Sequence, residues 1–121
     1  MIETIIERNN MYYCSYRNAG NLYLSKGCGR WVSREFDMAK VIFQKEHSRI
    51  CVFPFQKQGW IDDPDVYFLN SMDDSALIIN NCDLVNQAIE AGFAIGRYKA
   101  TRLNDGWIIV DLTQQMKRYR K

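Results

Sequence analysis

Two runs of strand-forming residues near the end of the chain flank a turn signal, and this pattern most constrains the fold. The first run is FAIGRYKATRL, residues 93–103, and the second is WIIVDL, residues 107–112. Between them stands Asn-Asp-Gly, which supplies the residue types that tight hairpin turns require. The sequence therefore predicts an antiparallel hairpin over residues 93–112.

The first third of the chain has the same character. Residues 11–17, MYYCSYR, place side chains in strand-like alternation, and residues 21–25, NLYLS, form a second candidate strand. Residues 26–29, KGCG, supply glycines for a turn, and residues 30–32 predict a short third strand. Together these segments predict an N-terminal β-meander.

Helical spacing follows the meander. Ser33 is a residue type that caps helices, and Phe36, Ala39 and Phe43 recur at i, i+3 and i+7. We therefore expect a helix that begins at Ser33 and carries His47 at the end of its apolar stripe.

A second helix is predicted over residues 82–91. Asn80 or Asn81 would cap it, and Gly92 stands where a C-terminal glycine belongs. Its apolar stripe consists of Leu84, Val85, Ala88 and Ile89.

Short apolar runs at residues 49–55, 66–70 and 75–79 predict further strands. The predicted fold class is α+β: a mainly antiparallel sheet, with an N-terminal meander and a C-terminal hairpin, and two helices packed on one face. Its 121 residues are 47% hydrophobic and 25% charged, which suits one domain over residues 1–121 with a basic C-terminal tail at about 114–121.

Neither a membrane span nor a signal peptide is predicted. The apolar runs are shorter than the ~18 residues that a span needs, and the first eight residues, MIETIIER, interrupt their apolar stretch with charges. We therefore expect a cytoplasmic protein without membrane contact, in the host-cell cytoplasm if a phage encodes it. The motifs of nucleotide cofactors are also missing, so no cofactor is predicted.

Four cysteines invite a metal or catalytic interpretation. Their spacings of 14, 23 and 31 residues lack the short C-x₂₋₄-C step of zinc sites, so no metal site is predicted. Cys14, Cys51 and Cys82 suit small core positions.

Cys28 is the leading candidate for enzyme chemistry, because Lys26 and Arg30 would favour its thiolate. A cysteine enzyme also needs a base, and the one histidine, His47, falls on the predicted helical stripe. The flanking glycines are better explained by a turn, so we expect Cys28 to be an exposed turn residue and the protein not to be an enzyme.

Charge is segregated along the chain, although the net charge is only +2. Residues 1–57 carry nine basic and five acidic side chains, residues 58–96 carry seven acids and no Lys or Arg, and residues 97–121 carry seven basic and two acidic side chains. If the acidic block formed one surface, opposite fields would lie on different faces.

The acidic block contains candidate residues for protein contact. Trp60 and Tyr67 are residue types that anchor interfaces, although core packing explains each equally well. Between them stand Asp62, Asp63 and Asp65, which lack the ligand offsets of a calcium loop and suit a turn or a steering surface.

The basic residues support an alternative function. Arg97 and Lys99 would share one strand face, with Arg102 on the other. In the tail, cations surround an aromatic ring, a combination that suits phosphate contact with base stacking. A nucleic-acid-binding module, a pocket for a small phosphorylated ligand, and a solvated strand face with a solubilising tail all remain open. The tail residues concerned are Lys117, Arg118, Tyr119 and Arg120.

Residues 21–43, NLYLSKGCGRWVSREFDMAKVIF, resemble a pattern of small, uncharacterised bacteriophage accessory proteins. The positions that carry the resemblance are Tyr23, Leu24, Gly27, Trp31, Ala39, Lys40, Val41 and Phe43. The resemblance implies a protein that binds and blocks a host factor or a defence component. The function predicted from the sequence is therefore non-enzymatic binding and inhibition of a host or defence-system protein.

Overall fold

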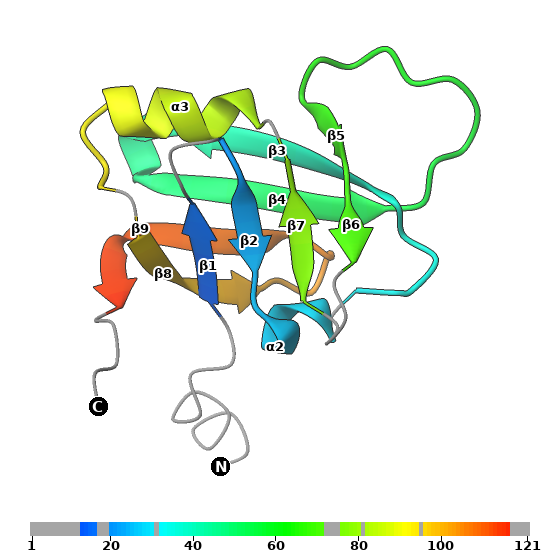
Figure 1. Ribbon diagram of the computed structural model, residues 1–121, viewed down its shortest axis with the longest axis horizontal. Helices are drawn as coiled ribbons and strands as arrows, with labels where there is room; N and C mark the ends of the chain where they lie inside the picture. The colour runs from blue at the N-terminus through cyan, green and yellow to red at the C-terminus, as the bar shows by residue number, and fades with distance from the viewer. Residues whose placement is uncertain are drawn as a thin grey trace.

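The computed structural model describes residues 13–16, 20–30, 32–71, 76–80, 82–94 and 96–116 (Figure 1). Within them, nine antiparallel strands form one sheet in the order β5-β3-β4-β9-β8-β1-β2-β7-β6. The strands are β1 Tyr13–Tyr16, β2 Leu22–Leu24, β3 Met38–Gln44, β4 Arg49–Phe55, β5 Val66–Phe68, β6 Asn70–Ser71, β7 Leu77–Ile79, β8 Gly96–Arg102 and β9 Ile108–Met116.

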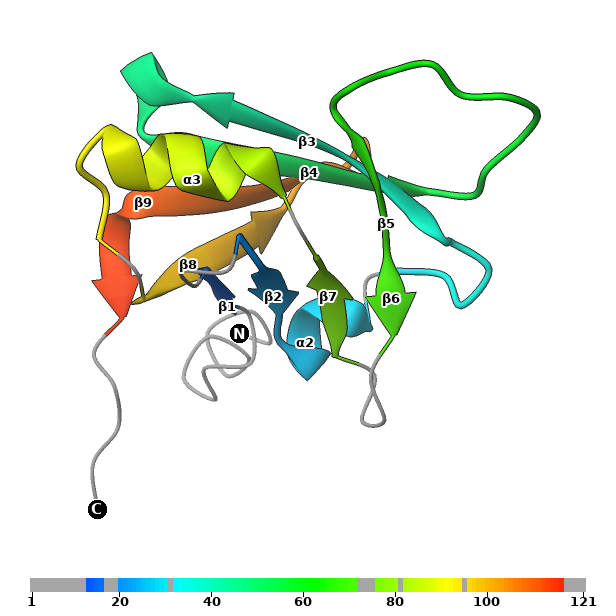
Figure 2. The same ribbon diagram turned by 45° about the horizontal axis from the view of Figure 1, so that its top comes forward.

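The sheet curls until its two ends meet in one segment of chain. Strands β5 and β6 stand at opposite ends of the strand order, yet only Leu69 separates them in sequence. Leu69 is buried, and its N–H donates to the Asp37 carbonyl at 2.9 Å. The continuous β5–β6 segment thus joins the β3–β4–β9 layer to the β7–β2–β1 layer in a barrel-like shape (Figures 1 and 2).

The core lies inside this curled sheet. Alternate residues of β2, β3, β4, β7, β8 and β9 point inward, and most of them are almost fully buried, as the period of two requires. The register places Val41 opposite Val52, Val52 opposite Ile108, and Leu22 opposite Ile79. Helix α3, Asp83–Glu90, lies over one end of the curled sheet (Figure 2), and its buried Leu84, Val85 and Ala88 join the same core.

Helix α3 confirms the predicted second helix. Gly92 adopts a φ of 101° after its last turn, which an L side chain rarely adopts. The Gly92 N–H donates to the Ile89 carbonyl, and the Phe93 N–H donates to the Ala88 carbonyl, both at 3.0 Å. This is a Schellman ending. The N-cap is Cys82 rather than the predicted Asn80, and Asn81 lies outside the described residues.

The C-terminal hairpin is also confirmed, with β8 and β9 paired around residues 103–107. The Leu103 N–H donates to the Trp107 carbonyl at 2.7 Å, and Gly106 supplies a φ of 97°. Strand β9 runs to Met116, which pairs with Arg97, so the strand includes the first residues of the tail predicted at about 114–121. Residues 117–121 lie outside the described residues.

The predicted helix from Ser33 to His47 is wrong. Residues 38–44 are strand β3, followed by a single 3-10 turn, η1, at Lys45–His47. The i, i+3, i+7 stripe concealed a period of two, in which Ala39 and Val41 face the core while Lys40 and Ile42 face outward. The α+β class with antiparallel pairing holds, but two helices packed on one face do not.

The meander is confirmed only as far as its first pair, β1 with β2. The predicted KGCG turn is instead a one-turn helix, α2, Lys26–Gly29, and Val32 lies in a bend rather than a third strand; Trp31 is outside the described residues. Cys28 is 0% exposed, so the expectation of an exposed turn residue is wrong. The Cys28 N–H donates to the hydroxyl of buried Ser25 at 3.5 Å, and that hydroxyl donates to Cys28 Sγ at 3.6 Å. One turn of helix thus folds the thiol inward.

Candidate functional site

The outer face of the sheet carries apolar side chains at one end. In the register of β5, β3 and β4, Phe68 lies opposite Met38, and Met38 lies opposite Phe55. Phe53, two residues before Phe55 on the same face, continues the row toward Trp107 at the end of the hairpin turn. We call these five residues, Phe68, Met38, Phe55, Phe53 and Trp107, the aromatic stripe.

Three rings of the stripe form two contacts, both through Phe53. The Phe53 and Phe55 rings stack with centroids 6.4 Å apart, and the Phe53 and Trp107 centroids are 5.1 Å apart at an interplanar angle of 44°. The side chain of Phe68 is 70% exposed, whereas those of Phe53, Phe55 and Trp107 are half-buried. Met38, which lies between Phe68 and Phe55, is buried, so the stripe exposes Phe68 at β5 and, beyond Met38, the half-buried rings of β4 and the hairpin turn.

A pocket of about 280 Å³ opens beside the stripe, at the end of the curled sheet. Its walls come from the loop after α2, the end of β4 and the β8–β9 turn. We call it the end pocket, and it is lined by Val32, Phe36, Phe53, Pro54, Arg102, Asn104, Asp105, Gly106 and Ile108. Since Phe53 belongs to both, the end pocket and the aromatic stripe are continuous.

Glycine at position 106 shapes this pocket. A Cβ at Gly106 would lie 3.2 Å from Cε1 of Phe53, and the φ of 97° disfavours any other residue. The turn is held by Asp105, whose Oδ1 accepts the Trp107 N–H at 3.2 Å. Glycine thus lets the turn approach the Phe53 ring, and Asp105 fixes the turn.

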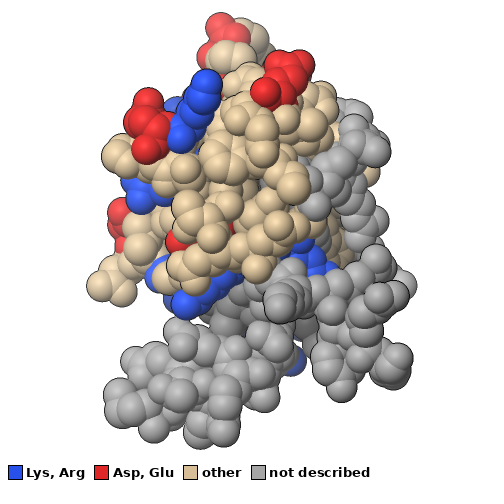
Figure 3. Space-filling model, turned by 90° about the vertical axis from the view of Figure 1, so that its left-hand side faces the viewer, with Lys and Arg blue, Asp and Glu red and all other residues tan. Residues whose placement is uncertain are grey.

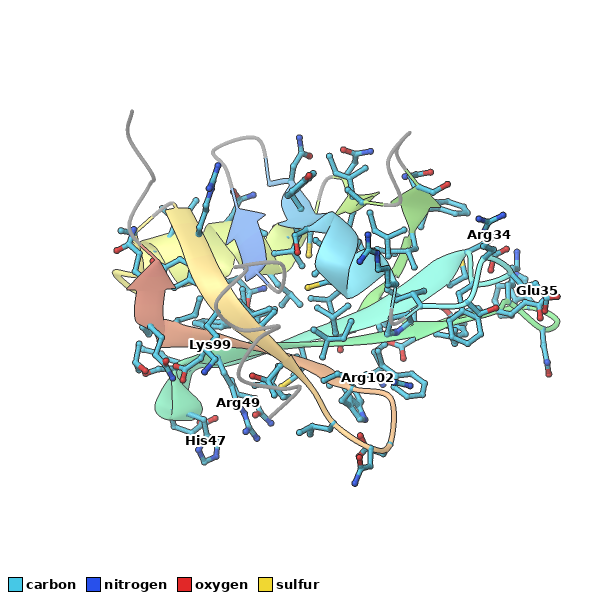
Figure 4. The ribbon with its side chains drawn as sticks, turned by 90° about the horizontal axis from the view of Figure 1, so that it is seen from below. Arg34, Glu35, His47, Arg49, Lys99 and Arg102 are labelled. Carbon is cyan, nitrogen blue, oxygen red and sulfur yellow. The ribbon has the colours of Figure 1, made fainter. Side chains whose placement is uncertain are left out.

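Arg102 brings a cation to the end pocket. It ends β8, and its inward parity after buried Tyr98 and Ala100 agrees with the prediction that it lies on the opposite face from Arg97 and Lys99. Within the described part of the chain, the structure gives the Arg102 guanidinium neither a salt bridge nor a hydrogen bond. Figure 4 shows it at the hairpin end, apart from Lys99.

The other basic residues of the hairpin lie elsewhere. Lys99 is opposite Asp111, which in turn is opposite Arg49, and Figure 4 shows Lys99, Arg49 and His47 grouped near η1. Arg49 Nε donates to Gln44 Oε1 at 2.5 Å. Arg97, Lys99 and Arg102 therefore do not form one phosphate-binding surface. The tail residues Lys117, Arg118, Tyr119 and Arg120 lie outside the described residues.

The loop of residues 56–65 holds Trp60 and the predicted acidic surface. Trp60 is 83% exposed, so its side chain is not part of the core. Asp63 forms a salt bridge with Lys40 at 3.1 Å and accepts the Asp65 N–H at 2.9 Å. These two interactions, the backbone hydrogen bond first, lower the pKa of Asp63. Asp62 is exposed, while Asp63 and Asp65 help to return the loop to β5.

Tyr67, unlike Trp60, does not lie on the surface. It is half-buried on the inward face of β5, opposite Ala39, and packs against the core. Burial raises the pKa of its hydroxyl. Of the two predicted aromatic contact residues, only Trp60 is placed on the surface.

The acidic block does not form one surface in the described residues. Asp62, Asp63 and Asp65 lie in the β4–β5 loop, whereas Asp83 and Glu90 lie at the two ends of α3. Figures 1 and 2 place the C-terminal end of α3 and this loop on opposite sides of the molecule. On the side where α3 ends, both charge signs are interspersed over a broad uncharged surface (Figure 3).

The described cysteines do not expose a reactive thiol. Cys28, Cys51 and Cys82 are buried, and burial raises the pKa of both Cys51 and Cys82. The described residues contain no cluster of three His, Cys, Asp or Glu suited to a metal ion. They also include no helix long and apolar enough to cross a membrane.

The stripe was missed at the sequence level, although part of its signal was present. In FPF, residues 53–55, the two phenylalanines are two apart and so share a strand face, while Pro54 faces the core. The alignment of Phe68 with Phe55 across Met38 needs the β5–β3–β4 register, which the sequence alone does not give.

No family model, curated protein or solved structure matches this chain.

Proposed function

We propose that this protein is a non-enzymatic binding protein that contacts a protein partner through the aromatic stripe and Trp60. The observation that carries the proposal is Phe68, which is 70% exposed at the end of a row of apolar side chains that runs through buried Met38 to the half-buried Phe55 and Phe53. Contiguous apolar surface of this kind typically marks an interaction site, whereas single exposed apolar residues need no explanation.

The composition of the stripe supports a protein partner. Phenylalanine, tryptophan and methionine are enriched at protein interfaces, and tryptophan often supplies much of the binding energy. The stripe lies on paired strands, so its rings lose little freedom when a partner binds. Trp60 stands on the loop that follows Phe55 and would add an adaptable contact at the edge.

Inhibition of the bound partner is part of the same proposal. The resemblance of residues 21–43 to bacteriophage accessory proteins implies inhibition of a host or defence protein. Occupying a surface of such a target needs no catalytic group, which agrees with the burial of Cys28.

Nucleic-acid binding is the second candidate, and the group of Lys99, Arg49 and His47 favours it. This group lies near η1, away from the aromatic stripe, so substitutions can separate the two functions. Exchange of Lys99 and Arg49 for Glu would abolish binding through phosphates and leave binding through the stripe unchanged.

The test is capture of partners from bacterial lysate on tagged protein, with and without nuclease. The wild type is compared with Trp60→Ser/Phe68→Ser and with the control Asn86→Ser, which alters an exposed position of α3. We expect a nuclease-resistant protein to bind the wild type and the control but not the double variant. Equal capture by all three would overturn the stripe as the interface, and nuclease-sensitive capture lost in Arg49→Glu/Lys99→Glu would favour the second candidate.

A further inference from the structure

The end pocket has an apolar wall and a polar rim, and its size suits one large side chain. Val32, Phe36, Phe53 and Pro54 surround it, with Ile108 behind them. Its volume of about 280 Å³ lies at the lower end of the ~300–1,000 Å³ typical of sites for whole small-molecule ligands. A leucine, phenylalanine or tryptophan side chain of a partner would fit inside it.

The polar rim of the pocket holds one cation, Arg102, and one carboxylate, Asp105. Arg102 offers guanidinium donors that no described residue engages, and guanidinium matches a carboxylate in a bidentate geometry. Asp105, the acid on the same rim, already accepts the Trp107 N–H through Oδ1. Asn104 adds a neutral amide to the rim.

We propose that the end pocket binds a large apolar side chain of the partner protein together with an adjacent carboxylate, which pairs with Arg102. This proposal rests on the proposed function and deepens it, because Phe53 joins the pocket to the aromatic stripe. The partner segment would run along the stripe and place its anchor residue in the pocket. An acidic side chain next to the anchor, or a C-terminal carboxylate on it, supplies the same group.

Two small probes test the pocket without the partner. N-acetylphenylalanine carries a benzyl group and a carboxylate, while its amide carries the same benzyl group without the charge. Binding at millimolar concentration is followed by NMR, through the Gly106 amide and the Arg102 Nε–H signal. We expect both probes to shift the Gly106 signal, and the acid to bind about two- to fivefold more tightly than the amide, as for an exposed ion pair.

Variants separate the two parts of the site. Arg102 is exposed, so the Arg102→Gln variant should fold normally. It should abolish the preference for the acid while leaving amide binding unchanged. Phe36→Ala, which removes a pocket wall, should weaken both probes, and Asn86→Ser should change neither. No shift of pocket signals with either probe, or an acid preference that persists in Arg102→Gln, would overturn the proposal.

The partner experiment keeps this inference distinct from the proposed function. If a partner is lost in Trp60→Ser/Phe68→Ser but retained at full strength in Arg102→Gln and Phe36→Ala, the stripe is the interface and the pocket proposal fails. If all of these variants weaken capture, and Arg102→Gln also loses its preference for the acid probe, both stand. Exchange of the acidic residue next to the anchor in the identified partner for its amide should then match the loss in Arg102→Gln.

Discussion

The two faces of strand β4 show how this protein uses apolar residues in two ways. Ile50 and Val52 face the core and are 0% exposed, whereas Phe53 and Phe55, from the same strand, lie half-buried on the outside. The inner residues are surrounded by other core side chains, so the need to form a core explains why they are apolar. The Phe53 ring packs against the Phe55 and Trp107 rings, and both phenylalanines keep part of their surface in solvent. Apolar surface that folding does not require is the strongest indication of function in this chain.

Truncation on the inner face should have the largest effect. Ile50→Ala removes a buried side chain between Phe43 on β3 and Val110 on β9, and should lower the free energy of unfolding by about 2–5 kcal/mol through lost burial and the cavity left behind. Urea unfolding followed by circular dichroism measures this. A loss below about 1 kcal/mol would mean that the inner row does not carry the core.

Truncation within the packed part of the stripe should cost less. Phe53→Ala and Trp107→Ala each remove a half-buried ring, and the contact between the two rings should contribute about 0.5–1.5 kcal/mol to stability. A double-mutant cycle in urea isolates that coupling energy. Additive effects of the two substitutions would show that the rings are placed side by side without stabilising each other, which would weaken the view of the stripe as a rigid surface.

The contrast between the faces also explains which predictions from the sequence succeeded. The hairpin and α3 were found because local signals, Asn-Asp-Gly and Gly92, fix their ends. The β3 segment was misassigned because Phe36, Ala39 and Phe43 fit a helical period while its alternation also fits a strand. Antiparallel pairing with β4 and β5 decided between them, and such pairing is not local.

The candidate site was less accessible to sequence reasoning. Exposure of Trp60 was one of two equal alternatives, and the structure places its side chain in solvent. The end pocket needs three segments far apart in sequence, the loop after α2, the end of β4 and the β8–β9 turn. Arg102 was singled out from its charge alone, whereas its significance comes from the apolar walls around it.

Substitution at the exposed end of the stripe should leave stability almost unchanged. Phe68→Ser removes a ring that is 70% exposed, so the free energy of unfolding should stay within about 0.5 kcal/mol of the wild type while partner capture is lost. Urea unfolding and the capture assay measure the two quantities on one preparation. A loss of stability comparable to that of Ile50→Ala would make Phe68 a core residue and remove the basis of the proposed function.

The smallest expected effect lies at the charged end of the outer face, and it depends on pH. Asp111 Oδ1 accepts the Thr113 hydroxyl and N–H at 2.6 and 2.9 Å, and Oδ2 accepts the Gln114 amide at 2.7 Å. These hydrogen bonds, that from the Thr113 hydroxyl first, lower the pKa of Asp111.

Because the folded-state pKa is the lower one, the contribution of Asp111 to stability is complete above the unfolded-state value of about 3.9 and is lost as pH falls through the folded-state value. Asp111→Asn should therefore lower the urea midpoint slightly near pH 7, where the contribution is complete, and flatten the fall in the midpoint between about pH 5 and pH 2. Identical acid slopes for the wild type and Asp111→Asn would show that these hydrogen bonds do not favour the ionised carboxylate. The outer face would then differ from the inner one only in its aromatic stripe, and not in a second, electrostatic contribution to stability.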